Sequence, residues 1–299
     1  MATQKQINQT YNYMDEIIRL SLGETPDFSC AMYNGDLSKT LEQAQAAKHD
    51  YILSGIRFQP GHRVLDIGCG WGPVLQAVRQ GGGRGIGLTL SSKQFESCRR
   101  QGFEVYLQDW KDVTVETCGP MDGVVSVGAF EHFCSIEEHL GGRQDEIYDK
   151  FFRLCRDLLP AGGRLFLQTM MWGRQAPPYR DISLRAPRGS DGYVVAVLSK
   201  FYPGSWLPSG EEQILRCAKP YFNLVSLNNG WKDYMRTMEQ WSRIKGVGFT
   251  KPAVLLRILG SFFTDRDFFY KMKSQFGGYQ KECFRRHIID HQRILFERV

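Results

Sequence analysis

The stretch from Arg63 to Gly72, Arg-Val-Leu-Asp-Ile-Gly-Cys-Gly-Trp-Gly, constrains the fold of this chain more than any other. Its apolar first half predicts a buried strand, and a helical pattern follows from Pro73 to Gln80. Three alternating glycines join the two, and glycine allows a sharp turn that brings bare backbone close to a ligand. The free N–H groups at the start of the helix are suited to bind that ligand. The stretch therefore predicts a ligand-binding turn between a strand and a helix.

Strands and helices alternate on either side of this turn, which is typical of a doubly wound parallel sheet in an α/β protein. Helices are expected at 5–22, 40–56 (capped by Ser38 or Thr40), 73–80, 92–101 and 145–158, and strands at 63–67, 84–88, 104–108, 123–127 and 164–171. The alternation stops at residue 172, where a long excursion rich in proline, glycine and arginine runs to residue 192. Beyond it we expect a helix at 210–220, a strand at 222–228, and helical structure at 233–244 and 265–296.

This pattern predicts one domain over residues 1–299 with four parts. They are an N-terminal helical cover (1–58), a ligand-binding core (59–171), an insertion that covers the substrate (172–209), and a C-terminal part of the core with further helices (210–299).

Charge and composition narrow the class of function. The net charge is +6, and no basic cluster with a nucleic-acid-binding module accompanies it, so we expect no nucleic-acid partner. The mild excess of positive charge suits an anionic substrate, an acidic carrier protein or an anionic membrane surface. The eight cysteines include no Cys-x-x-Cys pair, which argues against zinc and a disulfide framework. No apolar run is long enough to span a bilayer, and the first ten residues lack a signal-peptide pattern, so a cytoplasmic protein is expected.

The second predicted strand decides between two nucleotide cofactors. A dinucleotide site places an acidic residue at the end of that strand to hold a ribose. Here the strand ends in Gly87-Leu88-Thr89-Leu90-Ser91, with no acid, which argues against NAD. A glycine turn directly after Asp66 instead suits S-adenosylmethionine, which has no pyrophosphate.

Four motifs then carry a family resemblance. The segments VLDIGCGWG, GLTLSSKQ, LQDW and VSVGAFEHF, together with FYPGSWLPS at 201–209, resemble the cyclopropane fatty acid synthase and mycolic acid methyltransferase family of S-adenosylmethionine enzymes. The resemblance covers nearly the whole chain. It implies a Rossmann-like class I methyltransferase fold with a doubly wound, mostly parallel sheet of seven strands.

The resemblance also implies which residues bind the cofactor. The loop is shaped by Asp66, Gly68, Gly70 and Gly72; the ribose is held by Thr89 and Gln94; the adenine lies against Asp109 and Trp110; the methionine end lies near Gly128 and Glu131; and the N-terminal cover closes over the site with Tyr11, Phe28 and Ser29. An aromatic face suits both the adenine and a sulfonium.

These relatives methylate an isolated carbon–carbon double bond, and a base then removes a proton from the resulting carbocation. In the family, bicarbonate is that base, held by Cys, Glu, His and Tyr. The matching positions here are Cys30, Glu146, Gln168 and Tyr234, with Gln168 in place of the histidine. Glutamine donates a hydrogen bond but does not titrate. Either bicarbonate is held differently, or Glu146 itself removes the proton.

The substrate is left open between two classes. The arginines of the excursion, above all Arg180 and Arg185, suit a prenyl diphosphate, with Mg²⁺ as a bridging ion, and Tyr202 and Trp206 offer aromatic faces to it. The alternative is an unsaturated fatty acyl chain, as in the family. Methylation of an amine and a binding protein without activity are the other readings. No protein metal site is expected, and the sequence does not predict the oligomeric state.

Overall fold

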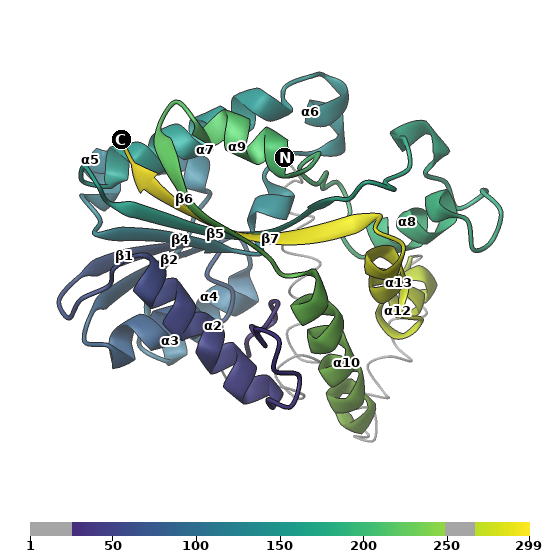
Figure 1. The fold of residues 1–299 in the computed structure, drawn as a ribbon, viewed down its shortest axis with the longest axis horizontal. Coiled ribbons are helices and arrows are strands. Elements are labelled where there is room, and N and C mark those ends of the chain that lie inside the picture. The colour runs from purple at the N-terminus through teal and green to yellow at the C-terminus, as the bar shows by residue number, and fades with distance from the viewer. Residues whose placement is uncertain (1–25, 249–266) are drawn as a thin grey trace.

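The computed structural model describes residues 26–248 and 267–299, which form one seven-stranded sheet with helices on both faces (Figure 1). The strand order is β3-β2-β1-β4-β5-β7-β6. The first five strands run parallel, and β7 runs antiparallel to both of its neighbours, β5 and β6. The predicted doubly wound, mostly parallel sheet is therefore confirmed. The strands are β1 (Arg63–Ile67), β2 (Arg84–Thr89), β3 (Glu104–Leu107), β4 (Gly123–Val127), β5 (Arg164–Trp172), β6 (Phe222–Asn229) and β7 (Ile289–Arg298).

Helices cover the two faces of this sheet and gather at one end of it (Figure 1). On one face lie α2 (Leu41–Gly55), α3 (Pro73–Gln80) and α4 (Ser92–Arg100). The other face carries α5 (Val115–Cys118), α7 (Gln144–Leu158) and α9 (Glu211–Ala218), with α6 (Ile136–Leu140) beside them. The remaining helices are α8 (Asp191–Ser199), α10 (Trp231–Gly248), α12 (Phe268–Phe276) and α13 (Tyr279–Arg285), and three short 3-10 helices are η1 (Trp110–Asp112), η2 (Phe130–His132) and η3 (Tyr179–Asp181).

Local sequence sets the start of α2. The side chain of Thr40 accepts a hydrogen bond from the backbone N–H of Gln43, and the Gln43 side chain accepts one in return from the N–H of Thr40. This reciprocal capping box satisfies two backbone donors that the first turn leaves unpaired. Of the two caps that the sequence predicts, the structure selects Thr40.

The predicted helix at 265–296 is wrong over its last quarter, because residues 289–298 form strand β7. Its residues pair with β5 along nine positions, from Ile289 opposite Trp172 to Glu297 opposite Arg164. Both faces of β7 are covered, so the run shows no alternation of buried and exposed residues that would mark it as a strand. The helices α12 and α13 that precede it are separated by Gly277 and Gly278.

Helix α8 was not predicted. It lies directly after the arginine-rich excursion, and its residues from Gly192 to Leu198 are all buried. A helix that is apolar all round shows no amphipathic period in its sequence. The predicted helix at 5–22 and Tyr11 lie outside the described residues.

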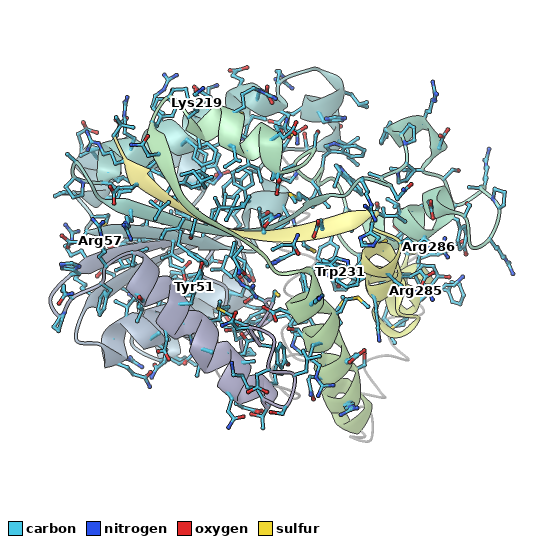
Figure 2. All side chains as sticks on the ribbon, viewed as in Figure 1. Tyr51, Arg57, Lys219, Trp231, Arg285 and Arg286 are labelled. Atoms are coloured by element: carbon cyan, nitrogen blue, oxygen red, sulfur yellow. The ribbon has the colours of Figure 1, made fainter. Side chains whose placement is uncertain are left out.

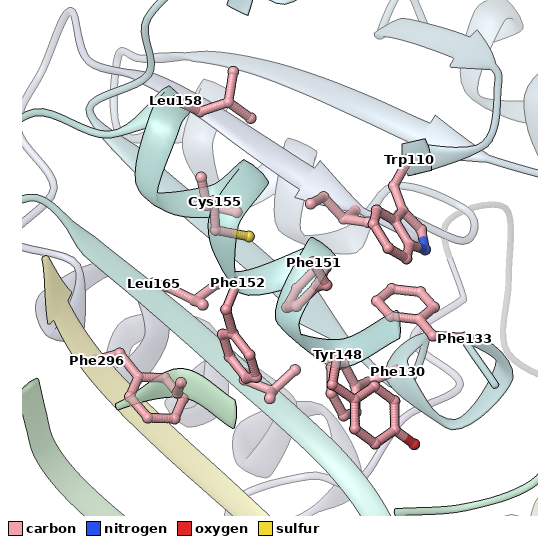
Figure 3. Packing of buried hydrophobic residues seen from close by; sticks show 14 of the residues in the cluster. Trp110, Phe130, Phe133, Tyr148, Phe151, Phe152, Cys155, Leu158, Leu165 and Phe296 are labelled. Atoms are coloured by element: carbon pink, nitrogen blue, oxygen red, sulfur yellow. The ribbon is translucent and has the colours of Figure 1, made fainter. Parts of the chain in front are cut away.

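An aromatic cluster fills the space between the sheet and α7 (Figure 3). Trp110 packs against Phe133 and meets Phe151 edge to face, with ring centroids 5.1 and 5.5 Å apart. Phe130 stacks on Tyr148 at 4.4 Å in the same cluster. The core of the domain thus fixes the rings of Trp110 and Phe133 where they border the cavity described below.

The end of the molecule beyond β5 is tied together by α8, α12 and α13. Figure 2 shows Arg285 and Arg286 at this end, and Trp231 where β6 meets α10. The indole N–H of Trp231 donates to the carbonyl of Phe284 at 2.7 Å, and Arg286 pairs with Asp191 of α8 at 2.9 Å. These contacts tie α10 to α13 and α8 to Arg286, the residue that caps α13. Within the described ranges, no helix has the length and apolar character needed to cross a membrane.

Candidate active site

A cavity that is partly open to solvent lies at the carboxyl ends of β1, β2 and β4. In a doubly wound sheet this is the edge at which ligands bind. The lining includes predicted cofactor residues from every motif of the core and from the chain before α2: Phe28, Ser29, Asp66, Gly68, Gly70, Thr89, Gln94, Asp109, Trp110 and Gly128. It also includes Gln108 and His132, from two of the motifs, and Lys48, which the sequence did not single out.

The glycine turn forms the floor of this cavity. All three glycines have positive φ angles, +85° at Gly68, +56° at Gly70 and +86° at Gly72. A Cβ on Gly68 would lie 2.2 Å from the Cβ of Ala129, whereas a Cβ on Gly70 would meet nothing within 4 Å. Gly72 does not line the cavity and instead caps α3 in a left-handed conformation. The turn therefore leaves open space above Gly70, where a ligand can approach the backbone.

Polar side chains at the ends of β2 and β3 line the far part of the cavity. The hydroxyl of Thr89 donates to the side-chain oxygen of Gln94 at 2.8 Å, which fixes both side chains. The Asp109 carboxylate accepts from the N–H of Lys111, and burial raises the pKa of that carboxyl. The indole N–H of Trp110 is buried and meets no acceptor in the described part of the chain. This end presents an aromatic face, a carboxyl group and a paired hydroxyl and amide, which suit an adenosine.

Asp66 lies at the other end of the glycine turn and is 2% exposed. Its Oδ1 atom has no hydrogen-bond donor within residues 26–248 and 267–299. Burial, reinforced by the charge of Asp27, raises the pKa of Asp66 to about 7. A buried carboxyl with an unpaired oxygen fits a cationic group such as the ammonium and sulfonium of S-adenosylmethionine.

A buried ion pair holds the chain segment that covers this cavity. Lys48 of α2 is 1% exposed, and its ammonium pairs with Asp27 at 2.5 Å and donates to the hydroxyl of Ser29 at 2.6 Å. The imidazole of His49 contacts the same Asp27 carboxylate at 2.8 Å, and Gln45 donates to the backbone carbonyls of Asp27 and Ser29. Burial favours the neutral acid, but Lys48 and His49 outweigh it and hold the pKa of Asp27 well below its usual range.

This network changes the expected part of Ser29. Its hydroxyl donates to Asp27 at 2.7 Å and accepts from Lys48, so both bonds hold the covering segment in place. The sequence carried a signal for Lys48, since it falls on the buried stripe of α2 with Leu41, Ala44, Gln45 and Ile52. A lysine on such a stripe requires a buried partner.

A second group of polar residues borders the cavity on the side of β5. Gln168 is 1% exposed and donates to the backbone carbonyl of Cys30 at 3.2 Å. The backbone carbonyl of Gln168 accepts from the backbone N–H of Gly128, a residue of the cavity wall. Burial raises the pKa of the Cys30 thiol to about 12 and that of the Tyr234 hydroxyl well above its usual value. The structure thus brings three of the four predicted catalytic residues, Cys30, Gln168 and Tyr234, into one buried region.

Glu146 is not part of this group, so the prediction that it acts there is wrong in position. It lies on the outer face of α7 with 57% of its side chain exposed, and it pairs with Lys150 one helical turn away at 2.7 Å. Helix α7 turns its apolar side to the sheet, which leaves Glu146 on the solvent side.

A buried carboxylate near Tyr234 belongs instead to Glu131, a residue that the sequence analysis placed at the methionine end of the cofactor. It is 3% exposed, and it accepts a hydrogen bond from the backbone N–H of Met170 at 2.8 Å. Its Oε2 atom is buried without a partner among the described residues. Burial raises the pKa of Glu131 to about 7, against the hydrogen bond from Met170, and its charge acts on the hydroxyls of Tyr202 and Tyr234.

The predicted substrate residues separate into two pairs. Tyr202 is tilted against the ring of His132 at 6.0 Å, and Trp206 packs against Trp172 at 4.9 Å, so both aromatic residues belong to the wall between the insertion and the core. Arg180 and Arg185 lie on the surface of the excursion. Arg180 is 86% exposed and its nearest acid is Asp181, 3.9 Å away. The structure does not bring the arginines to Gln168 or Tyr234.

Comparisons with known proteins agree with this geometry. Residues 1–245 match the family model "Mycolic acid cyclopropane synthetase". The chain is 31% identical over 249 residues to cyclopropane mycolic acid synthase 2 of Mycobacterium leprae, covering 79% of this chain and 78% of that protein. It is also 31% identical over 250 residues to hydroxymycolate synthase MmaA4 of Mycobacterium tuberculosis, covering 79% and 76% of the two chains.

Solved structures show the same relationship. The crystal structure of mycolic acid cyclopropane synthase CmaA1 with SAH and CTAB superposes with a TM-score of 0.78 at 28% identity, covering 98% of both chains. A geranyl diphosphate methyltransferase superposes with a TM-score of 0.64 over 99% of both chains at 15% identity, a likeness of fold alone. SAH is the product that S-adenosylmethionine leaves after methyl transfer. The chain belongs to the mycolic acid cyclopropane synthetase family of S-adenosylmethionine-dependent methyltransferases.

Proposed function

We propose that this protein transfers a methyl group from S-adenosylmethionine to the carbon–carbon double bond of an unsaturated fatty acyl chain, giving a cyclopropane or a methyl-branched product. The observation that carries the proposal is the position of Glu131. A buried carboxyl with an unpaired oxygen and a pKa raised to about 7 is held by the backbone N–H of Met170 on β5, two residues after Gln168, whose backbone carbonyl accepts from Gly128 in the wall of the cofactor cavity. The mycolic acid synthases in the comparisons, named for lipid substrates, support the acyl chain.

The residues around the cavity fit the cofactor. The unpaired Oδ1 of Asp66 would face the cationic methionine end, the hydroxyl of Thr89 and the side chain of Gln94 would hold the ribose, and the Trp110 indole would cover the adenine. When bound, S-adenosylmethionine supplies a methyl group on a sulfonium, which an electron-rich alkene can attack. Asp27, Ser29 and Lys48 hold the covering segment against the cavity and so limit the access of water.

Methylation of an alkene leaves a carbocation, and the product requires the loss of a proton. Glu131 suits this step, because a carboxylate with a pKa near 7 accepts a proton readily at neutral pH. Its partner, the N–H of Met170, keeps one oxygen fixed while the other stays available. Tyr202 and Tyr234, whose hydroxyls feel the charge of Glu131, add aromatic rings to the region, which favour a cation and exclude water. Bicarbonate held by Cys30, Gln168 and Tyr234 is the second candidate for the base.

A prenyl diphosphate, with Mg²⁺ as its counter-ion, is the second candidate substrate, and the four arginines of the excursion are what favours it. Their exposure argues against it, since a diphosphate bound there would lie in solvent, where ion pairs contribute little. An acidic carrier protein or an anionic membrane would suit the same arginines as a surface partner.

The test measures S-adenosylhomocysteine release with unsaturated acyl substrates, prenyl diphosphates and benzylic amines in parallel. Turnover of the acyl substrates, unchanged in an Arg180→Ala/Arg185→Ala variant, is the expected result. Preferential turnover of a diphosphate, with a KM raised by the double substitution, would select the second candidate. Release with amines alone would overturn alkene methylation.

A further inference from the structure

Arg293 is the largest fully buried side chain in the described part of the chain. It comes from β7, the strand that the sequence did not predict. It lies opposite Gln168 in the register of β5 and β7. A cation buried this deeply requires a complete set of partners, because removing it from water is costly.

Arg293 has that complete set. Its Nε–H donates to the Gln168 side-chain oxygen at 3.3 Å. One terminal nitrogen bonds to Asn228 at 2.9 Å and to Asp233 at 3.0 Å. The other donates to the carbonyl of Ala31 at 2.7 Å and to the sulfur of Cys30 at 3.4 Å. An arginine has five N–H groups, and all five are used. Arg293 therefore has no donor left for a substrate or an anion.

This contact determines which way the amide of Gln168 faces. The two ends of an amide are nearly indistinguishable by shape, and their orientation follows from their partners. Arginine only donates, so the end of Gln168 that faces Arg293 must be the oxygen. The nitrogen then faces the opposite way, where one of its hydrogens goes to the carbonyl of Cys30. Its second hydrogen has no acceptor among residues 26–248 and 267–299.

We propose that Arg293 is a positioning residue of the reacting site, which fixes Gln168 as a hydrogen-bond donor toward an oxygen of the base or the substrate. Asp233 balances its charge, and the Asp233 carboxylate is held in turn by the backbone N–H of Tyr33 at 3.1 Å. The inference rests on the proposed function, because the group that accepts from Gln168 belongs to that reaction. It assigns to β7 a part in the site in addition to its part in the sheet.

The experiment compares the wild type with Arg293→Lys, Gln168→Leu and the double variant. Lysine keeps the charge but lacks the planar fork that Arg293 uses, and leucine keeps the size of glutamine without its amide. Each single variant is expected to lower kcat by about tenfold or more, as expected for the loss of an oriented hydrogen bond, with cofactor affinity unchanged. The double variant is expected to be no slower than Gln168→Leu, because Arg293 acts through Gln168.

Additive losses in the double variant, or full kcat in Arg293→Lys, would overturn the inference. If Arg293→Lys does not fold, Asn228→Ala removes a single anchor of the guanidinium, and a smaller loss of kcat that vanishes in the Gln168→Leu background is then expected.

A second readout keeps the inference separate from the proposed function. The thermal midpoint is measured with and without bicarbonate, in the absence of substrate. A rise in the wild type that is lost in both single variants supports the inference even when no alkene is methylated. A rise of equal size in the wild type and Arg293→Lys overturns it, and if bicarbonate raises the midpoint of neither protein, the comparison of kcat values decides. Absence of turnover with every alkene lipid, by contrast, overturns the proposed function.

Discussion

Glu131 and Met170 are joined by a 2.8 Å hydrogen bond from the backbone N–H of Met170 to the Glu131 carboxylate. The bond ties the turn after β4 to the strand β5, which also carries Gln168. It holds one oxygen of a buried carboxylate and leaves the other without a partner among the described residues. A carboxylate in this state is costly for the folded protein, and such groups occur where a reaction uses them.

Glu131→Gln is expected to lower kcat by about 10²-fold or more, because the amide cannot accept the proton, while the affinity for S-adenosylhomocysteine stays near that of the wild type. Glu146→Gln is the matched control, since Glu146 is exposed and paired with Lys150. It is expected to keep full turnover. Equal losses of kcat in the two variants would mean that Glu131 is not the base.

The pH dependence of turnover is expected to report Glu131. Burial raises its pKa to about 7, and only the ionised carboxylate accepts a proton. The rate therefore rises as pH increases through about 7 and levels off above it, the rise being absent from the residual activity of Glu131→Gln. Initial rates between pH 5.5 and 8.5 at saturating cofactor measure this. A rate that falls over the same interval would assign Glu131 the role of an acid.

The affinity for S-adenosylmethionine is also expected to increase with pH, through the ionisation of Asp66. Burial and the nearby Asp27 raise the pKa of Asp66 to about 7, and a cationic cofactor binds the ionised form better. The dissociation constant of S-adenosylmethionine should fall as pH rises from 6 to 8, with release of a proton on binding. Calorimetry in two buffers of different ionisation enthalpy measures both quantities. Asp66→Asn should bind weakly and without pH dependence; an unchanged pH profile in that variant excludes Asp66 as its source.

Substitution of Gly68 is expected to lower the stability of the protein, whereas substitution of Gly70 is expected to weaken cofactor binding. Gly68→Ala would place its Cβ 2.2 Å from that of Ala129, so the loop must shift and the protein loses stability. Gly70→Ala meets no atom within 4 Å and bears only the cost of its positive φ, about 1 kcal/mol. Gly70→Ala should therefore fold but bind cofactor weakly, since the methyl group occupies ligand space. Denaturation curves and cofactor titrations separate the two effects, and normal binding by Gly70→Ala would show that no ligand approaches there.

The ion pair between Lys48 and Asp27 is expected to stabilise the folded protein. Lys48→Met leaves the Asp27 carboxylate buried without its main partner, and breaking a buried pair costs about 3–5 kcal/mol. Adding Asp27→Asn to Lys48→Met should recover much of this loss, because no unpaired charge remains. Urea unfolding of the wild type, both single variants and the double variant measures the coupling. Purely additive changes would mean that the two groups do not stabilise each other.

The cofactor half of the site could be predicted from the sequence because it is built from contiguous motifs. The turn from Asp66 to Gly72, the pair Thr89 and Gln94, and the segment with Asp109 and Trp110 each follow one strand of a parallel sheet. The carboxyl ends of such strands meet at one edge, and the motifs that carry the family resemblance lie together there.

The reacting half could not be predicted in the same way, because its members come from distant segments. Cys30 precedes α2, Glu131 follows β4, and Arg293 lies on β7, where burial of both faces hides the period of a strand. Glu146 was favoured as a carboxylate in a region of motif resemblance, and only the packing of α7 shows that its side chain faces solvent. Arg293 itself resembles a surface residue in sequence, and its five partners become visible only when β7 is placed between β5 and β6.

The antiparallel insertion of β7 also sets the order in which the protein can mature during synthesis. A nascent chain that has emerged only as far as α13 holds every residue of the glycine turn but lacks Arg293, and β6 has no strand to join it to β5. The residues that line the cofactor cavity and the residue that we propose to orient Gln168 are thereby synthesised at different moments of translation. A stalled or clipped chain that ends before Ile289 would retain the residues that line the cofactor cavity without those that orient Gln168, and the exposed edge of β5 would make it a target for quality control.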